Sequence, residues 1–115
     1  MSSRYIIDYL EFPSQNGAAT RDFFAQAFAW NFTNYGPTYD AINEAGIDAG
    51  IQGDRQEATA APLAVIRTSD LEQAERDVIA AGGVITRWAF DFPGGRRFHF
   101  REPGGNELAV WVALA

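Results

Sequence analysis

The chain has 115 residues, of which 47% are hydrophobic and 21% charged, and its net charge is −6. This length is enough for one domain with its own buried core. The acidic balance argues against a nucleic acid partner, because phosphate-binding surfaces are basic. The absence of cysteine excludes disulfides and thiolate metal ligands. No segment is apolar over the length of a membrane span or of a secretory signal. We therefore expect a cytoplasmic protein that binds neither nucleic acid nor membrane.

The first half of the sequence predicts a strand, a helix and three further strands. The first strand is expected over residues 5–12 and the helix over residues 18–28, with Asn16 as the N-cap of the helix. Apolar residues recur at i, i+4 spacing in this helix, Phe23 and Phe28 among them, and predict a buried face. Three strands are then expected, at residues 30–34, 39–43 and 47–51.

The second half predicts the same succession of elements. A strand is expected over residues 63–68, and Ser69 with Glu72 has the spacing of a capping box at the start of a helix. This helix should end near Ala81, where Gly82 can adopt the left-handed conformation. Three strands again follow, at residues 84–88, 96–101 and 107–112.

The two halves align at a constant offset of 54 residues, which places Asn16 on Asp70 at the two helix starts. This predicts an α+β protein made of two βαβββ modules, over residues 4–53 and 62–113. Neither module can cover its sheet alone, so we expect both to form one domain over residues 1–115. An unrelated α+β sandwich with a chance internal similarity is the alternative.

The last part of the chain, residues 92–111, predicts a β-hairpin around a turn rich in proline, glycine and asparagine. Because side chains alternate across a strand, Arg97, His99 and Arg101 should share one face, and Phe98 and Phe100 the other. The only histidine of the chain is therefore expected between two arginines, on the sheet face opposite the core.

The order of several motifs resembles the vicinal-oxygen-chelate superfamily, which includes glyoxalases, bleomycin-resistance proteins and extradiol dioxygenases. The segments that carry this resemblance span most of the chain and are residues 9–13, 22–30, 69–71, 80–83 and 101–106. The resemblance is greatest to compact bacterial glyoxalase-like proteins. It implies two βαβββ modules curled into a half-open barrel around a shared cavity.

Metal-dependent members of that superfamily place one ligand on the first strand of each module and one on the last. The resemblance carries these positions to Tyr9, Ala49, Leu63 and Ala109. Three of these residues have no donor atom, and a divalent ion needs several histidine or carboxylate ligands. Glu107 lies two residues before the last position, although alternation places it on the same face. We therefore expect neither a metal nor another cofactor.

Six residues are the candidates for a ligand site in the cavity. His99 and Glu11 are the candidate catalytic residues, because histidine serves as acid and base near neutral pH and Glu11 is the nearest expected counter-charge. The candidate ligand-binding residues are Tyr9, Tyr39, Arg97 and Trp111. Each also has a structural interpretation: a hydrogen-bonded histidine in a sheet, an ion pair of Glu11, or aromatic core packing.

These observations lead to one predicted function and two alternatives. The prediction is a glyoxalase/bleomycin-resistance-like homodimer that binds a small organic molecule in its barrel cavity, with a degenerate metal site. The first alternative is a metal-independent isomerase or lyase in which His99 and Glu11 transfer protons. The second is a drug-sequestering resistance protein that captures a cationic ligand without turnover.

Overall fold

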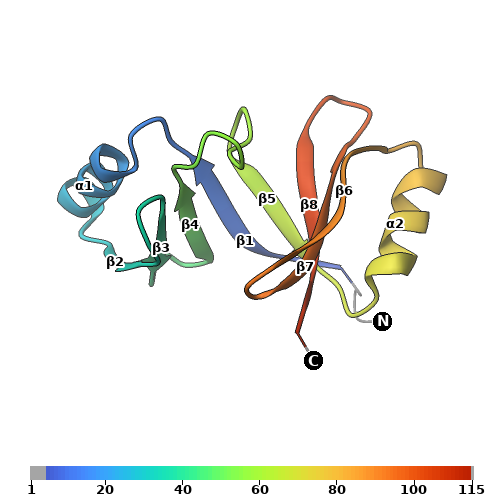
Figure 1. The fold of residues 1–115 in the computed structure, drawn as a ribbon, viewed down its shortest axis with the longest axis horizontal. Helices are drawn as coiled ribbons and strands as arrows, with labels where there is room; N and C mark the ends of the chain where they lie inside the picture. Colours follow the sequence, from blue (N-terminus) through green and yellow to red (C-terminus); the bar gives the residue numbers. More distant parts are fainter. Residues whose placement is uncertain (1–4, 115) are drawn as a thin grey trace. The chain divides into compact units, whose positions relative to one another are not determined.

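The computed structural model of the chain describes residues 5–114 (Figure 1). Its elements in the first half are β1 (Ile6–Pro13), α1 (Gly17–Phe28), β2 (Asn31–Asn34), β3 (Tyr39–Asn43) and β4 (Asp48–Gln52). Those of the second half are β5 (Leu63–Arg67), α2 (Leu71–Ala80), β6 (Val84–Phe92), β7 (Gly95–Arg101) and β8 (Glu107–Ala113). This order confirms the predicted α+β chain of two βαβββ modules.

The chain divides into two compact units within this element order. Unit 2 is Tyr9–Leu63, and unit 1 joins the segment before Tyr9 to the segment after Leu63. Strand β1 therefore begins in unit 1 and ends in unit 2. The prediction that both modules form one domain stays a prediction, and each unit is described by itself below. No helix within residues 5–114 is long and apolar enough to span a membrane.

Unit 2 is a four-stranded sheet with the order β2-β3-β4-β1, in which β1 and β4 are parallel and the other pairs antiparallel. Helix α1 covers one face of this sheet. The buried core on that face is formed by Ile42, Ala49 and Ile51. Phe24 of α1 packs edge-on against Phe12 of β1, with ring centroids 5.6 Å apart.

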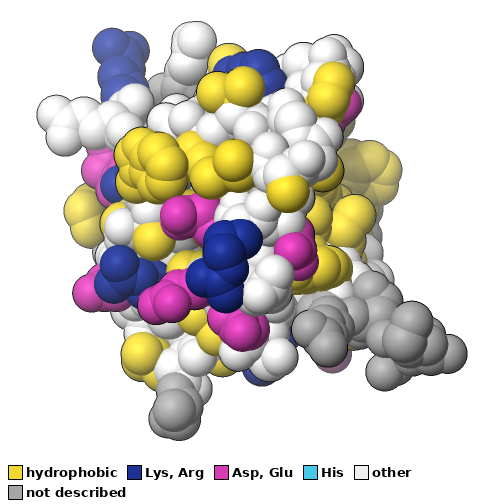
Figure 2. Space-filling view, turned by 90° about the vertical axis from the view of Figure 1, so that its right-hand side faces the viewer, with side chains coloured by type: hydrophobic (Ala, Val, Ile, Leu, Met, Phe, Trp, Pro, Cys, Tyr) yellow, Lys and Arg dark blue, Asp and Glu magenta, His cyan; other side chains and the backbone are white. Residues whose placement is uncertain are grey.

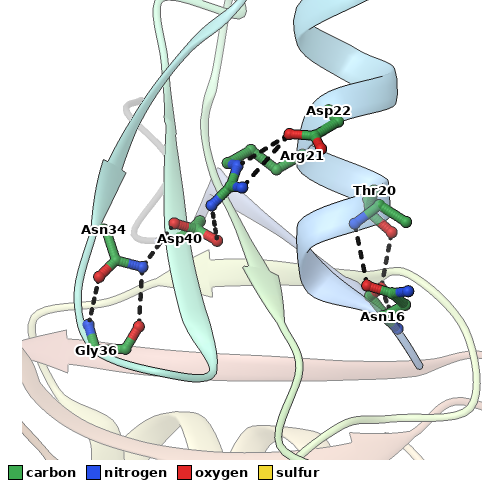
Figure 3. A network of polar contacts seen from close by, with 9 residues as sticks. Asn16, Thr20, Arg21, Asp22, Asn34, Gly36 and Asp40 are labelled. Atoms are coloured by element: carbon green, nitrogen blue, oxygen red, sulfur yellow. Dashed lines mark hydrogen bonds and ion pairs between the residues drawn. The ribbon is translucent and has the colours of Figure 1, made fainter.

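A polar network fastens α1 to β3 on the helix side of unit 2 (Figure 3). Asp40 is 7% exposed, and its carboxylate lies 3.8 Å from the guanidinium of Arg21. Asn34 donates to the same carboxylate at 2.9 Å. Because a buried carboxylate is costly without partners, these contacts fix the position of the helix on the sheet.

Unit 1 repeats this layout with the order β5-β8-β7-β6. Helix α2 covers one face, where the core consists of Leu71, Ala74, Phe98, Phe100 and Val110. Viewed from the side of α2, the surface mixes acidic, basic and apolar side chains without a large patch of one kind (Figure 2). The predicted alternation along the hairpin is confirmed, since Phe98 and Phe100 are buried under the helix.

The helix predictions are correct in position and wrong in two details. The N-cap of α2 is Asp70, whose carboxylate accepts a hydrogen bond from the backbone of Gln73 at 3.1 Å. The predicted capping box at Ser69 therefore lies one residue too early. In α1, Asn16 is the N-cap as predicted. The predicted buried face of α1 is formed only in part: Phe24 packs against the core of unit 2, whereas Phe23 is 60% exposed and Phe28 is 55% exposed.

Candidate functional site

The sheet face of unit 1 that lies opposite α2 carries three of the six candidates, Arg97, His99 and Trp111. In the strand register, Arg97 pairs with Trp111, His99 with Ala109, and Arg101 with Glu107. We call this surface the His99 face. Its charged and aromatic side chains come from β5, β6, β7 and β8 and are those of Arg67, Arg87, Phe90, Phe92, Arg97, His99, Arg101, Glu107 and Trp111.

His99 lies at the centre of this face and is 2% exposed. Its Nδ1 atom is 3.1 Å from Oε2 of Glu107. An ionised carboxylate only accepts hydrogen bonds, so Nδ1 carries the proton of the neutral ring and Nε2 keeps its lone pair. Within the described residues, this buried Nε2 atom has no hydrogen-bond partner. The sheet thus holds an imidazole nitrogen with an unused lone pair in a defined orientation.

The surroundings of His99 favour the neutral ring. Burial lowers the pKa of His99, and the positive charge of Arg97 lowers it further. The hydrogen bond and charge of Glu107 act in the opposite direction but are outweighed. Glu107 is itself positioned by Thr86, whose hydroxyl donates to Oε2 at 3.0 Å. His99 can therefore act as a hydrogen-bond acceptor or a proton acceptor at neutral pH.

Aromatic rings flank the histidine on this face. The ring centroid of Phe90 lies 5.8 Å from that of His99, and the centroid of Phe92 lies 6.1 Å from that of Trp111. The guanidinium carbon of Arg97 is 5.4 Å from the centre of Phe90 and 5.5 Å from the centre of Phe92. These are cation–π distances, so the arginine is held over the rings.

Strand β6 is irregular directly opposite His99. Its register against β7 shifts between Ile85 and Arg87, and again between Arg87 and Phe90. Each shift inserts one additional residue on β6, which is the mark of a β-bulge. Bulges interrupt the ladder, re-aim side chains and occur often beside functional sites. The bulges therefore set the direction in which Arg87 and Phe90 project beside His99.

The remaining candidates form a second cluster, in unit 2, which we call the tyrosine cluster: Tyr9, Glu11 and Tyr39. Tyr39 donates a hydrogen bond to Oε2 of Glu11 at 3.0 Å. The hydroxyls of Tyr9 and Tyr39 are also hydrogen-bonded to each other. Because the proton of Tyr39 points to the carboxylate, Tyr9 must be the donor in the second bond. A relay thus runs from Tyr9 through Tyr39 to Glu11.

The carboxylate of the tyrosine cluster is shielded from water, whereas Tyr9 and Tyr39 are half-buried. Glu11 is 5% exposed. Burial, together with the charge of Glu11, raises the pKa of Tyr39 far above its usual range, so this phenol stays protonated. Tyr39 therefore remains the hydrogen-bond donor toward Glu11.

The six predicted site residues thus fall into two groups. Arg97, His99 and Trp111 are brought together on the His99 face, whereas Tyr9, Glu11 and Tyr39 are brought together in unit 2. The carboxylate that contacts His99 in unit 1 is that of Glu107, and the pairing of His99 with Glu11 stays a prediction. The sequence did contain a signal for Glu107, since alternation placed it on the face of His99.

The fold of this chain is similar to that of solved structures, whereas its sequence is not similar to known families. The sequence matches no known protein family and no curated protein. A glyoxalase/bleomycin resistance protein/dioxygenase superfamily member from Vibrio splendidus 12B01 superposes with a TM-score of 0.67 at 12% identity, over 96% of this chain and 98% of that one. The chain has the glyoxalase/bleomycin resistance/dioxygenase fold. Identity this low shows the fold alone.

Two further solved structures extend this similarity of fold. Methylmalonyl-CoA epimerase from Mycobacterium tuberculosis has a TM-score of 0.68 at 12% identity and covers 94% of this chain and 87% of its own. A protein described as an NAD-dependent benzaldehyde dehydrogenase from Legionella pneumophila has a TM-score of 0.75 at 12% identity, with 92% and 98% covered. The predicted resemblance is therefore confirmed at the level of the fold.

The strand register corrects one of the four predicted metal positions. In unit 1, Ala109 pairs with the residue two places after Leu63. The equivalent pair in unit 2 joins Glu11, two places after Tyr9, to Gly50. The fourth position is therefore Gly50. The assignment to Ala49 is wrong, because Ala49 is buried in the core beneath α1.

These four positions do not fit a divalent metal centre. Gly50, Leu63 and Ala109 have no side-chain donor, and Leu63 and Ala109 are fully buried. The space beside Gly50 is filled by the hydroxyl groups of Tyr9 and Tyr39, which a β-carbon at residue 50 would overlap. No group of three or more histidine, cysteine, aspartate or glutamate side chains within residues 5–114 could hold a metal ion.

Proposed function

We propose that this glyoxalase-like protein binds a small organic molecule on the His99 face of unit 1. The observation that carries the proposal is the buried Nε2 atom of His99, which has no hydrogen-bond partner within the described chain. A buried polar atom without a partner costs about 1–3 kcal/mol. A ligand that donates a hydrogen bond to Nε2 would recover this free energy on binding.

The side chains around His99 are those expected of a ligand site. Trp111 and Phe92 offer flat apolar surface, and Trp111 is itself held in place because its indole donates to Asp8 at 2.9 Å. Arg97 lies over the rings of Phe90 and Phe92. Sites for small organic molecules commonly combine such aromatic walls with a few oriented polar groups.

A ligand screen that follows the only histidine tests this proposal. Long-range proton–nitrogen NMR reports on both ring nitrogens of His99, while a thermal shift reports ligand-induced stabilisation. We expect a bound compound to shift the Nε2 resonance and to stabilise the wild type but not His99→Phe. Arg96→Gln is the matched control. Arg96 lies on the same strand as His99 but forms an ion pair with Asp91, at 3.1 Å. Equal stabilisation of wild type and His99→Phe would contradict the proposal.

A metal-independent isomerase or lyase is the second candidate, and the contact between His99 and Glu107 favours it. A neutral imidazole whose second nitrogen donates a hydrogen bond to a carboxylate is a suitable general base. In this proposal, Nε2 takes a proton from a carbon of the bound ligand, Glu107 stabilises the imidazolium, and the proton returns to a different carbon. Exchange of ligand protons for solvent deuterium, lost in His99→Phe, is the test.

We further propose that Tyr39 and Glu11 act as a proton relay within unit 2, with Glu11 as its end. The buried carboxylate and its hydrogen bond of 3.0 Å to Tyr39 support this role. A drug-sequestering function is less well supported, because arginines outnumber carboxylates on the His99 face. Such a face disfavours a cationic ligand.

We propose a homodimer as the assembled state. Strand β6 lies at the edge of the sheet in unit 1 and exposes Val84 to 64% and Trp88 to 63%. Exposed apolar residues along an edge strand favour a covering partner. Sedimentation equilibrium of the wild type and of Trp88→Lys tests this, since the charged variant should sediment as the smaller species. The cytoplasmic location stays a prediction from the sequence.

A further inference from the structure

We infer that the ligand of the His99 face is a flat organic acid with a hydroxyl group, such as a hydroxylated aromatic carboxylate. This inference rests on the proposed function and adds the chemical class of the ligand. Three features of the face point to the hydroxyl, to the flat body and to the negative charge of this ligand.

The hydroxyl follows from the orientation of His99. Glu107 accepts the Nδ1 proton at 3.1 Å and is held there by Thr86. The opposite nitrogen, Nε2, can then only accept. A carboxylate or ether oxygen of a ligand cannot satisfy it, whereas an O–H or N–H group can. The site therefore selects a ligand that carries a hydrogen-bond donor.

The flat body follows from the rings that border His99. Phe90 lies beside the imidazole, with centroids 5.8 Å apart, and Phe92 and Trp111 form a neighbouring pair. Aromatic rings favour stacked or edge-on contact with another planar group. The two bulges of β6 flank the segment opposite His99, and the ring of Phe90 lies under the guanidinium of Arg87, 3.5 Å from it.

The negative charge follows from Arg67 on β5. Its guanidinium lies 5.0 Å above the ring of Trp111 and its side chain is 54% exposed. The carboxylate of Asp8 is 4.0 Å away, the limit of an ion pair, and one of its oxygens already accepts from the indole of Trp111. An exposed guanidinium with a distant counter-charge is suited to a second carboxylate.

The spacing of these groups sets the size of the ligand. Arg67 pairs with Trp111, and Ala109 pairs with His99. The two side chains thus lie two strands and two residues apart, which separates their α-carbons by about 12 Å. A compound with one or two rings has the length that this separation requires.

A panel of matched aromatic compounds tests the inference with the full chain. The probes are 4-hydroxybenzoate and 4-hydroxycinnamate, the methyl ether of each, and the corresponding uncharged alcohols. Binding is measured by calorimetry and by the Nε2 resonance of His99. We expect the hydroxy acids to bind about tenfold or more tightly than their methyl ethers, which lack the donor, and than the alcohols, which lack the charge.

Variants separate the contributions of the two ends of the ligand. Arg67→Gln should weaken binding of the hydroxy acids by about tenfold and leave the alcohols unchanged, whereas Arg96→Gln should alter neither. Methyl ethers that bind as tightly as the hydroxy acids would overturn the inference. A compound of another class that shifts the His99 resonance would overturn it too, while the proposed function would stand. If no compound of the panel or of the general screen shifts the His99 resonance, both this inference and the proposed function fail.

Discussion

The hydroxyl group of Tyr39 occupies the space into which a side chain at Gly50 would project. The two residues lie on neighbouring strands, where Gly50 pairs with Ala41, two places after Tyr39. Only glycine leaves this space open, and the phenol then reaches the carboxylate of Glu11. The tyrosine cluster therefore depends on a residue that contributes no side chain of its own.

Gly50→Ala should destabilise the protein. The added methyl group would overlap the hydroxyls of Tyr9 and Tyr39, and overpacking of this kind costs about 1–3 kcal/mol. Urea unfolding measures the loss in free energy of unfolding. Gly17→Ala is the matched control, because a β-carbon there meets only Ile51, at 4.0 Å. If both variants lose the same stability, the close packing around Gly50 is not the cause.

His99 should make the stability of the protein depend on pH near neutrality. Burial and the charge of Arg97 lower the pKa of His99 in the folded state, while the unfolded chain keeps the ordinary value near 6.5. As the pH falls below about 6.5, the unfolded state takes up the proton first, so the free energy of unfolding decreases. Stability from this group is complete above about pH 6.5 and is lost as the pH falls toward the folded-state pKa.

Urea unfolding of the wild type and of His99→Gln, at about pH 7.5 and about pH 5.5, measures this dependence. The variant should lose less stability than the wild type on acidification, because the glutamine side chain does not titrate. All carboxylates are common to both proteins, and those other than Glu107, which contacts residue 99, keep the same surroundings and cancel in the comparison. Parallel pH dependences in the two proteins would rule out an unfavourable protonation of His99.

Glu107→Gln should lower the pKa of His99 further and allow the proton of the neutral ring to sit on either nitrogen. The hydrogen bond and the charge of Glu107 are the contributions that raise this pKa. A neutral amide can donate or accept, so it no longer requires the proton to sit on Nδ1. NMR titration of the two ring nitrogens follows both effects. Glu72→Gln on the surface of α2 should leave the titration unchanged, and an unchanged titration in Glu107→Gln would contradict our assignment of the tautomer.

The sequence predicts the fold well because the two strongest signals, internal repetition and alternation, act over whole elements. Alternation placed His99 between Arg97 and Arg101 on the sheet face opposite the helix, and the strand register agrees. Single contacts were harder to predict, since they depend on register across strands. Glu107 reaches His99 only because β8 pairs with β7 at a particular offset, and bulges in β6 do not follow from residue type. Ala49 was misplaced by one residue for the same reason, and one residue reverses the face of a strand.

The start of α2 allows a direct test of another one-residue difference. Asp70 accepts from the backbone of Gln73 at 3.1 Å, which satisfies one of the free amides of the first turn. Thr68 in turn accepts from the backbone of Asp70 at 3.2 Å and fixes the approach to the helix. Asp70→Ala should therefore cost about 1 kcal/mol of the free energy of unfolding, as other cap removals do. Ser69→Ala should cost a few tenths at most, as exposed substitutions usually do. Thermal unfolding of both variants compares them, and a larger loss in Ser69→Ala would restore the capping box predicted from the sequence.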